Sequence, residues 1–202
     1  MDNKTEFLEL LRSTKREGIE YVIEDLENLG FFKAPASTRF HLNSEGGLLQ
    51  HSINVCHSAL KLREIYIAED DTLREALPKD SVIISALLHD VCKSDIYKPC
   101  TKKQKNSFGM WEEVPGYEED YSNFPMGHGE KSVIMLLLSG LEMTDAEMLA
   151  IRWHMTAWDL PFQSADAKSN FNKAKELHPL ISLIQAADGL SSNITERATD
   201  EI

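Results

Sequence analysis

Six residues with metal-binding side chains lie in or at the end of segments whose pattern is otherwise apolar: His51, His89, Asp90, His128, His154 and Asp188. A buried ionised aspartate without a partner is very costly, so such a side chain binds a metal, pairs with a cation or accepts several hydrogen bonds. A single inward histidine is more often a hydrogen-bonded core residue. Six such residues on five predicted helices favour a metal centre. Imidazole and carboxylate ligands together suit Mn, Fe, Co, Ni or Zn better than Ca.

The adjacent pair His89-Asp90 indicates more than one metal ion. Neighbouring residues on a helix are rotated by about 100°, so the two side chains can face neighbouring points of one cavity. Two metal ions ~3.5 to 4 Å apart, bridged by a carboxylate, use this geometry. We therefore predict that Asp90 is a bridging ligand. For Asp188, the alternative is that it caps the N-terminus of a neighbouring helix.

Helical periodicity predicts the elements that must position these residues. Apolar spacing from Phe7 to Leu29, broken near Gly18, predicts two amphipathic helices. A long helix is predicted from Leu48 to about Ala68, with His51 on its inward stripe. The members of that stripe are Leu48, Val55, Ala59, Leu62 and Tyr66.

Four more features of the pattern predict the remaining helices. The segment that opens at Pro78 and Asp80 is apolar almost all round and ends at His89-Asp90, which is typical of a helix covered on most sides. A second helix follows Gly127. The T-x-x-E sequence from Thr144 to Glu147 is a capping box that starts a third, running through His154. Pro179 suits the first turn of the last, in which Asp188 continues the buried stripe.

Residues 94–127 form a segment of different character. Short runs with aromatic residues flank turn residues at Asn106-Ser107 and Gly109, which predicts a small β-hairpin insertion. The insertion carries the one basic cluster of the chain, and a nucleotide could bind there beside Tyr97 and Trp111. The alternative is a solvated hairpin. The cluster consists of Lys98, Lys102, Lys103 and Lys105.

Composition bounds the class of protein. The 202 residues, 42% hydrophobic and 27% charged, predict one globular domain. A net charge of −12 repels bulk DNA and anionic membrane surfaces, so we expect neither as a partner and expect any nucleotide to bind at a local site. Three cysteines without a CxxC pair indicate a reducing compartment, and the strongest apolar run, Val133 to Leu138, is too short to span a membrane. We expect a cytoplasmic protein without a signal peptide.

The order H(51)…HD(89,90)…H(128)…H(154)…D(188) resembles the HD-domain superfamily of metal-dependent phosphohydrolases, in its two-metal form. The resemblance spans residues of about 40–195 and rests on GGLLQHS, ALLHDVCK, GHGEKS, IRWHM and AADGLSS. The whole-chain pattern looks like that of uncharacterised bacterial HD hydrolases. Two departures stand out: Cys92 replaces a frequent glycine after the HD pair, and WHM replaces the double histidine of many two-metal members.

The resemblance implies an all-α, single HD-domain helical bundle over residues 1–202, with N-terminal helices in 1–30, the HD core in 40–195 and the insertion in 94–127. It implies a phosphohydrolase, either a phosphodiesterase or a phosphomonoesterase, that cleaves a phosphate ester of a nucleotide or short oligonucleotide with metal-activated water. The oligomeric state stays open. Up to two divalent transition-metal ions are implied, with Mg also possible. By similarity, His51, His89, Asp90 and Asp188 hold the first ion, and Asp90, His128 and His154 hold the second.

The resemblance also implies residues that act on the substrate. Lys93 matches the family lysine that approaches a substrate phosphate, and with Asp90 it makes up the predicted catalytic pair; the alternative for Lys93 is a solvated cation at a helix end. Arg39 and His41, in the loop before His51, are further substrate-binding candidates. Two other functions use the same residues: a di-iron HD oxygenase, and a non-catalytic nucleotide sensor.

Overall fold

The computed structural model describes residues 2–156 and 164–197, which form a mostly helical fold with one two-stranded antiparallel hairpin. The N-terminal segment forms two helices and a short 3-10 turn, and the break between the helices lies at Gly18, as predicted. Phe7 and Leu11 of the first helix belong to the same core cluster as the later helices. These elements are α1 (Asn3–Ser13), α2 (Ile19–Asn28) and η1 (Phe31–Lys33).

The centre of the fold is α5 (Lys79–Leu88), whose residues from Ser81 to Leu88 are all buried. Its sequence is apolar almost all round because neighbours cover it on several sides: it packs against α1, α3, α8 and α10. The predicted helices that contribute site residues are all present. They are α3 (Gly47–Glu69), α7 (His128–Leu138), α8 (Asp145–Trp153) and α10 (Pro179–Leu190).

Local signals define the ends of these helices. The capping box is present: the Thr144 side chain accepts from the Glu147 backbone, and the Glu147 side chain accepts in return. Pro179 occupies the first turn of α10. At the start of α3, a Cβ on Gly47 would lie 2.0 Å from the carbonyl oxygen of Leu42. Glycine therefore lets the preceding loop fold tightly over this helix.

One predicted core position of α3 is wrong. Tyr66 is 47% exposed, and the buried face continues instead through Arg63 and Ile67. Arg63 is buried because its Nε donates a hydrogen bond to the carbonyl oxygen of Leu77, 2.7 Å away. With this hydrogen bond made, Arg63 belongs to the buried face of the helix, to which the apolar pattern had assigned Tyr66.

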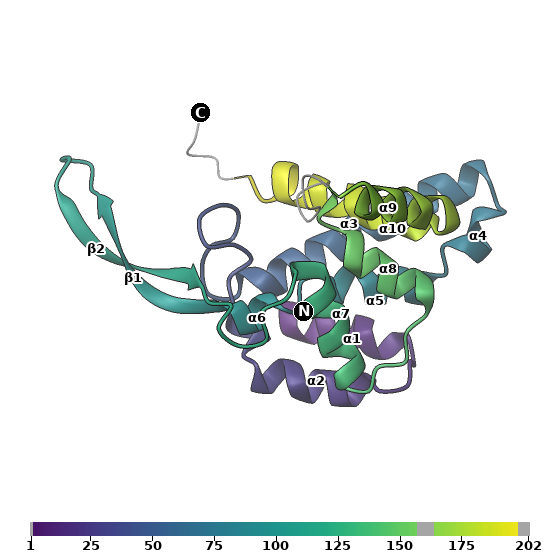
Figure 1. The fold of residues 1–202 in the computed structure, drawn as a ribbon, viewed down its shortest axis with the longest axis horizontal. Helices are drawn as coiled ribbons and strands as arrows, with labels where there is room; N and C mark the ends of the chain where they lie inside the picture. Colours follow the sequence, from purple (N-terminus) through teal and green to yellow (C-terminus); the bar gives the residue numbers. More distant parts are fainter. Residues whose placement is uncertain (1, 157–163, 198–202) are drawn as a thin grey trace.

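The predicted hairpin is confirmed. Strands β1 (Tyr97–Lys105) and β2 (Trp111–Glu119) pair antiparallel, from Tyr97 opposite Glu119 to Lys105 opposite Trp111. Figure 1 shows that it projects from the helical body, so its base borders the body and its tip lies far from it. The short helix α6 (Lys93–Ile96) leads directly from α5 into the hairpin.

Three α-helices in the described part of the chain were absent from the sequence prediction. These are the short α4 (Leu73–Ala76), the short α6 and the longer α9 (Ala165–Leu177). In α9 most residues are polar and Ala174 is the one buried residue, so this helix has no apolar stripe from which it could be predicted. No helix in the described ranges combines the length and the apolar character needed to cross a membrane.

Candidate metal centre

The fold gathers all six predicted metal-binding residues at one place. His51 comes from α3, His128 begins α7, and Asp188 lies in the last turn of α10, while the others directly follow α5 and α8. Four of the six are at most 2% exposed: His51, His89, Asp90 and His154. The His128 and Asp188 side chains are 12% and 19% exposed, which leaves the cluster open on their side.

Asp90 occupies the middle of the cluster, and its two carboxylate oxygens face different histidines. Oδ1 lies 2.5 Å from Nε2 of His128 and 3.2 Å from Nε2 of His154. Oδ2 lies 3.2 Å from Nε2 of His89 and 3.5 Å from Nε2 of His51. One carboxylate thus stands between two pairs of imidazoles, as a bridging ligand would.

Asp188 lies against the imidazoles of this cluster. Its Oδ1 is 3.4 Å from Nε2 of His51, and its carboxylate is grouped with His89 and His154, with possible ligand atoms all within 4.8 Å of one another. The Ser192 hydroxyl donates to Asp188 Oδ1 at 3.1 Å. These contacts place its carboxylate among the possible ligands and not at the start of a neighbouring helix.

Three of the histidines are held so that Nε2 faces the centre. Nδ1 of His89 donates to the Ala86 carbonyl oxygen at 2.9 Å, and Nδ1 of His154 donates to the Ile151 carbonyl oxygen at 2.7 Å. Nδ1 of His51 is likewise engaged by a carboxylate. A proton fixed on Nδ1 leaves the lone pair of a neutral imidazole on Nε2.

The resulting arrangement of donors fits a bound cation. Nε2 of His154 is buried and makes no well-aligned hydrogen bond, although Asp90 Oδ1 lies 3.2 Å away. The Nε2 atoms of His51 and His89 lie 3.2 Å apart, so two lone pairs face each other unless a proton or a cation lies nearby. Buried polar atoms without partners are uncommon in folded proteins. The buried histidine and aspartate groups could therefore hold metal ions.

Positive charge around Asp90 keeps its carboxylate ionised. Burial by itself would raise the pKa of Asp90, but Lys93, His89 and His128 hold it well below its usual range. Lys93 Nζ lies 2.6 Å from Asp90 Oδ2, and its side chain is 9% exposed. Burial would lower the pKa of Lys93, but Asp90 raises it. Lys93 is therefore not the solvated cation that one interpretation of the sequence proposed.

His51 is flanked by carboxylates on both of its ring nitrogens. Burial would lower its pKa, but hydrogen bonds to Asp188 and Glu196 raise the pKa of His51 to about 9. Without a bound cation, the protonated His51 imidazole and the Lys93 ammonium offset the charge of the buried carboxylates. A metal ion that binds at these nitrogens must displace a proton.

A cavity of about 670 Å³ opens beside the cluster. Its polar lining includes Lys93, His41 and His128, together with Ser37 and the carboxylate of Glu119. Its other walls are largely aromatic and apolar, formed by Phe40, Tyr97, Tyr121, Pro125, Met126 and Met155. It combines an ammonium and imidazole groups of the cluster with aromatic surfaces, an arrangement that suits an anionic group attached to a flat ring.

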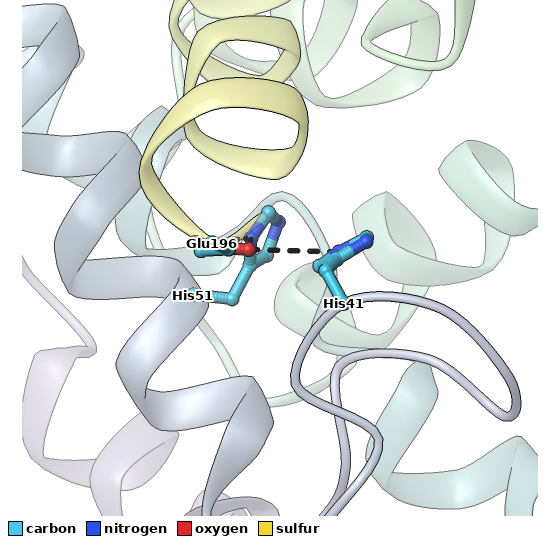
Figure 2. A group of neighbouring side chains, drawn as sticks. All are labelled: His41, His51 and Glu196. Carbon is cyan, nitrogen blue, oxygen red and sulfur yellow. Dashed lines mark hydrogen bonds and ion pairs between the residues drawn. The ribbon is translucent and has the colours of Figure 1, made fainter. Parts of the chain in front are cut away.

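The structure separates the two loop candidates. His41 lines the main cavity, and Figure 2 shows it beside His51 and Glu196. Arg39 is exposed and lines a different recess, together with Lys102 and Tyr117. A substrate contact by either residue stays a prediction.

Two of the four lysines in the basic cluster of the hairpin lie opposite acidic residues. Lys98 is paired in register with Glu118, and Lys103 with Glu113. Lys102 turns toward the body, where its Nζ donates to the Thr38 carbonyl oxygen at 2.7 Å. Cross-strand pairs of opposite charge stabilise a hairpin, which offers a structural role for these lysines beside the predicted nucleotide contact.

Glu196 belongs to the cluster but was missed by sequence reasoning. It lies eight residues beyond Asp188, after the apolar stripe of α10 has ended, in a polar stretch with no motif around it. Its carboxylate nevertheless reaches Nδ1 of His51, at 3.0 Å. The signal that could have found it is the presence of a second acidic residue shortly after the predicted ligand Asp188.

Comparison with known proteins identifies one distant homologue. No family model matches the chain, and no solved structure matches it significantly. A dihydroneopterin 2',3'-cyclic phosphate phosphodiesterase from Methanocaldococcus jannaschii is 32% identical over 80 residues. The match covers 40% of this chain and 30% of that relative. A distant homologue of this chain is thus a phosphodiesterase.

Proposed function

We propose that the chain is an HD-type, metal-dependent phosphohydrolase that cleaves a phosphate ester of a nucleotide or short oligonucleotide. The observation that carries this proposal is the position of Asp90, whose two oxygens face two different pairs of histidine Nε2 atoms. The distant phosphodiesterase homologue supports the reaction class. We further propose that residues 1–202 form one domain, with 94–127 as an insertion.

The proposed ligands divide into two sets that share Asp90. His51, His89, Asp90 and Asp188 would hold the first ion, and Asp90, His128 and His154 the second. The donor set suits Mn, Fe, Co, Ni or Zn, and Mg is also compatible with its carboxylates. When bound, such ions lower the pKa of a coordinated water and neutralise charge on a phosphoryl group.

The side chains of this protein supply positioning and electrostatics around that centre. The backbone carbonyls of Ala86 and Ile151 orient two of the histidines before any ligand arrives. The Lys93 ammonium lies at the junction of the cluster and the cavity, where it can stabilise negative charge on a phosphate. Tyr97 and Phe40 offer flat surfaces on which an aromatic ring can stack.

The first substrates to test are cyclic phosphodiesters. The homologue is named for a 2',3'-cyclic phosphate of dihydroneopterin, and a cyclic nucleotide presents the same chemistry of a strained phosphodiester beside a flat heteroaromatic ring. Linear dinucleotides and nucleoside monophosphates complete the comparison. A preference among them distinguishes a phosphodiesterase from a phosphomonoesterase.

The proposal is tested by metal analysis joined to a phosphoester panel. Purified protein is expected to contain up to two transition-metal ions per chain and to lose hydrolysis on treatment with a chelator. Single turnover in oxygen-18 water is expected to place the label in the phosphate product. Metal-independent turnover, or a trapped phospho-enzyme, would contradict the proposal.

The two other functions give different results in the same assay. A di-iron oxygenase requires two iron ions and dioxygen, whereas the proposed hydrolase is expected to work under argon with Mn or Zn. A nucleotide sensor binds its ligand without turnover. Hydrolysis that persists under argon therefore separates the proposed enzyme from both alternatives.

A further inference from the structure

We infer that Glu196 is a positioning residue that holds His51 with its Nε2 directed into the metal centre. The inference rests on the proposed metal-dependent function. Both Glu196 oxygens contact Nδ1 of His51, at 3.1 Å and 3.0 Å. The carboxylate side chain is 1% exposed, so water does not compete for this hydrogen bond. Figure 2 shows Glu196 directly beside the His51 ring.

One segment of chain delivers carboxylates to both nitrogens of His51. Asp188, in α10, lies 3.4 Å from Nε2, while Glu196 lies 3.0 Å from Nδ1. Between them runs η3 (Ser191–Thr195), a π-helical turn, and the Glu196 amide donates to the Ser191 carbonyl oxygen at 2.9 Å. A π-turn contains more residues than an α-turn and so changes the direction of the residues after it. The turn brings Glu196 back toward His51.

The Glu196 carboxylate is itself held in place from α3. Asn54 Nδ2 donates to Glu196 Oε1 at 2.9 Å, and Gln50 Nε2 donates to Asn54 Oδ1 at 2.9 Å. Both amides lie on α3, which carries His51: Gln50 comes one residue before His51 and Asn54 three residues after it. A hydrogen-bonded chain therefore runs from Gln50 through Asn54 to Glu196 and His51.

This arrangement has a chemical consequence for metal binding. A carboxylate that accepts the Nδ1 proton of a ligating histidine fixes its tautomer and ring orientation and raises the basicity of Nε2. His89 and His154 use backbone carbonyls at the same position. His51 is the one ligand of these three whose outer partner is charged. Its affinity for a cation therefore depends on Glu196 more strongly than the other two depend on their partners.

His41 completes the surroundings of Glu196. Its Nε2 lies 3.7 Å from Glu196 Oε2, beyond hydrogen-bond distance, and has no hydrogen-bond partner. His41, His51 and Glu196 also form a group with the composition of a metal site. That use of the group would require His51 to give up its Nδ1 proton, so it competes with the positioning role and provides a clear alternative outcome.

The test compares cobalt binding by the wild-type protein and its Glu196→Ala and Glu196→Gln variants, using the visible absorption of bound Co²⁺. Glu196→Ala is expected to weaken the first ion's affinity by about 10- to 100-fold, the usual loss for such a partner. Glu196→Gln keeps an acceptor for Nδ1–H without the charge, so its loss should be smaller. Asn54→Ala should lower the affinity in the same direction by less than Glu196→Ala. The matched control, Glu64→Gln, changes an exposed carboxylate and should bind as wild type.

Proton NMR of the metal-free protein provides a readout that does not depend on metal. A hydrogen-bonded Nδ1 proton of His51, identified by its loss in His51→Gln, is expected in the wild type and in Glu196→Gln but not in Glu196→Ala. Unchanged cobalt affinity in Glu196→Ala, with only a lower melting temperature, would overturn the positioning role. Loss of an additional cobalt ion in both Glu196→Ala and His41→Ala would overturn it in favour of a separate metal site. A wild-type protein that binds no cobalt would instead contradict the proposed function itself.

Discussion

Replacing Lys93 with methionine tests what this buried ammonium does. Its Nζ lies 2.6 Å from Asp90 Oδ2, whereas the sequence resemblance assigned it to a substrate phosphate. Methionine retains an unbranched apolar stem and removes the charge, so the variant removes the countercharge of Asp90 with little loss of packing. We expect a large effect on the stability of the metal-free protein.

The structure sets the size of that effect. Two unit charges 2.6 Å apart attract by about 6 kcal/mol at an effective dielectric constant of 20. Removing one partner of a buried pair costs about 3 to 5 kcal/mol after desolvation is included. Four histidines also face Asp90, and protonation of one of them restores part of the charge, so we expect about 3 kcal/mol. For a chain of this size, the melting temperature should fall by about 6 to 12 °C.

The loss should depend on pH. His51 has its pKa raised from 6.5 to about 9 in the folded protein, so its imidazolium contributes stability below pH 6.5, and this contribution is lost as the pH rises through 9. At pH 6 the imidazolium partly replaces Lys93. The destabilisation by Lys93→Met should therefore be smallest near pH 6 and largest above pH 9.

Urea denaturation of chelator-treated protein at several pH values measures this directly. The control Lys98→Met removes a half-exposed ammonium that lies 4.0 Å from Asp95 and should change the free energy of unfolding by less than about 0.5 kcal/mol. Saturation with cobalt should reduce the Lys93→Met deficit, because bound cations neutralise Asp90. An unchanged denaturation midpoint in metal-free Lys93→Met would refute the countercharge role. If Lys93 also contacts the substrate phosphate, kcat should fall by about 10²- to 10³-fold.

Three further predictions follow from contacts of single side chains. Asp90→Ala should remove most of both metal ions, because the two Asp90 oxygens face both ligand sets. His154→Ala should remove mainly the second ion. Elemental analysis that finds wild-type metal content in Asp90→Ala would contradict the role of Asp90 as a shared ligand. In steady-state kinetics, Lys102→Ala should raise KM and change kcat less, because Lys102 holds the loop at the cavity through the Thr38 carbonyl oxygen. Lys103→Ala, the control, should leave KM and kcat close to their wild-type values. In urea denaturation, Arg16→Met should lower the free energy of unfolding by about 3 to 5 kcal/mol. The variant leaves the fully buried carboxylate of Glu147 without its charged partner. A loss below about 1 kcal/mol would show that this ion pair behaves like an exposed one.

Sequence patterns alone were enough to predict the main helices of the fold and the polar residues that they bury. Helical spacing, capping residues and turns are local properties, so the break at Gly18, the capping box at Thr144 and the hairpin at Asn106 could be predicted without tertiary information. The same reasoning identified six inward histidines and aspartates as one cluster. Repeated polar side chains on otherwise apolar faces are too costly to occur by chance in separate cores.

The contacts that define the chemistry of the cluster depend on how the helices pack. Which oxygen of Asp90 faces which imidazoles depends on how α3, α5, α7 and α8 cross, and no local spacing encodes a crossing. The sequence pattern identified Lys93 as a candidate shortly after the His89-Asp90 pair, but only the fold shows that its ammonium lies against Asp90. Glu196 reaches His51 across 145 residues of sequence because a π-turn redirects the chain after α10. Periodicity stops at the end of a helix, and the partner beyond it is fixed by packing in three dimensions.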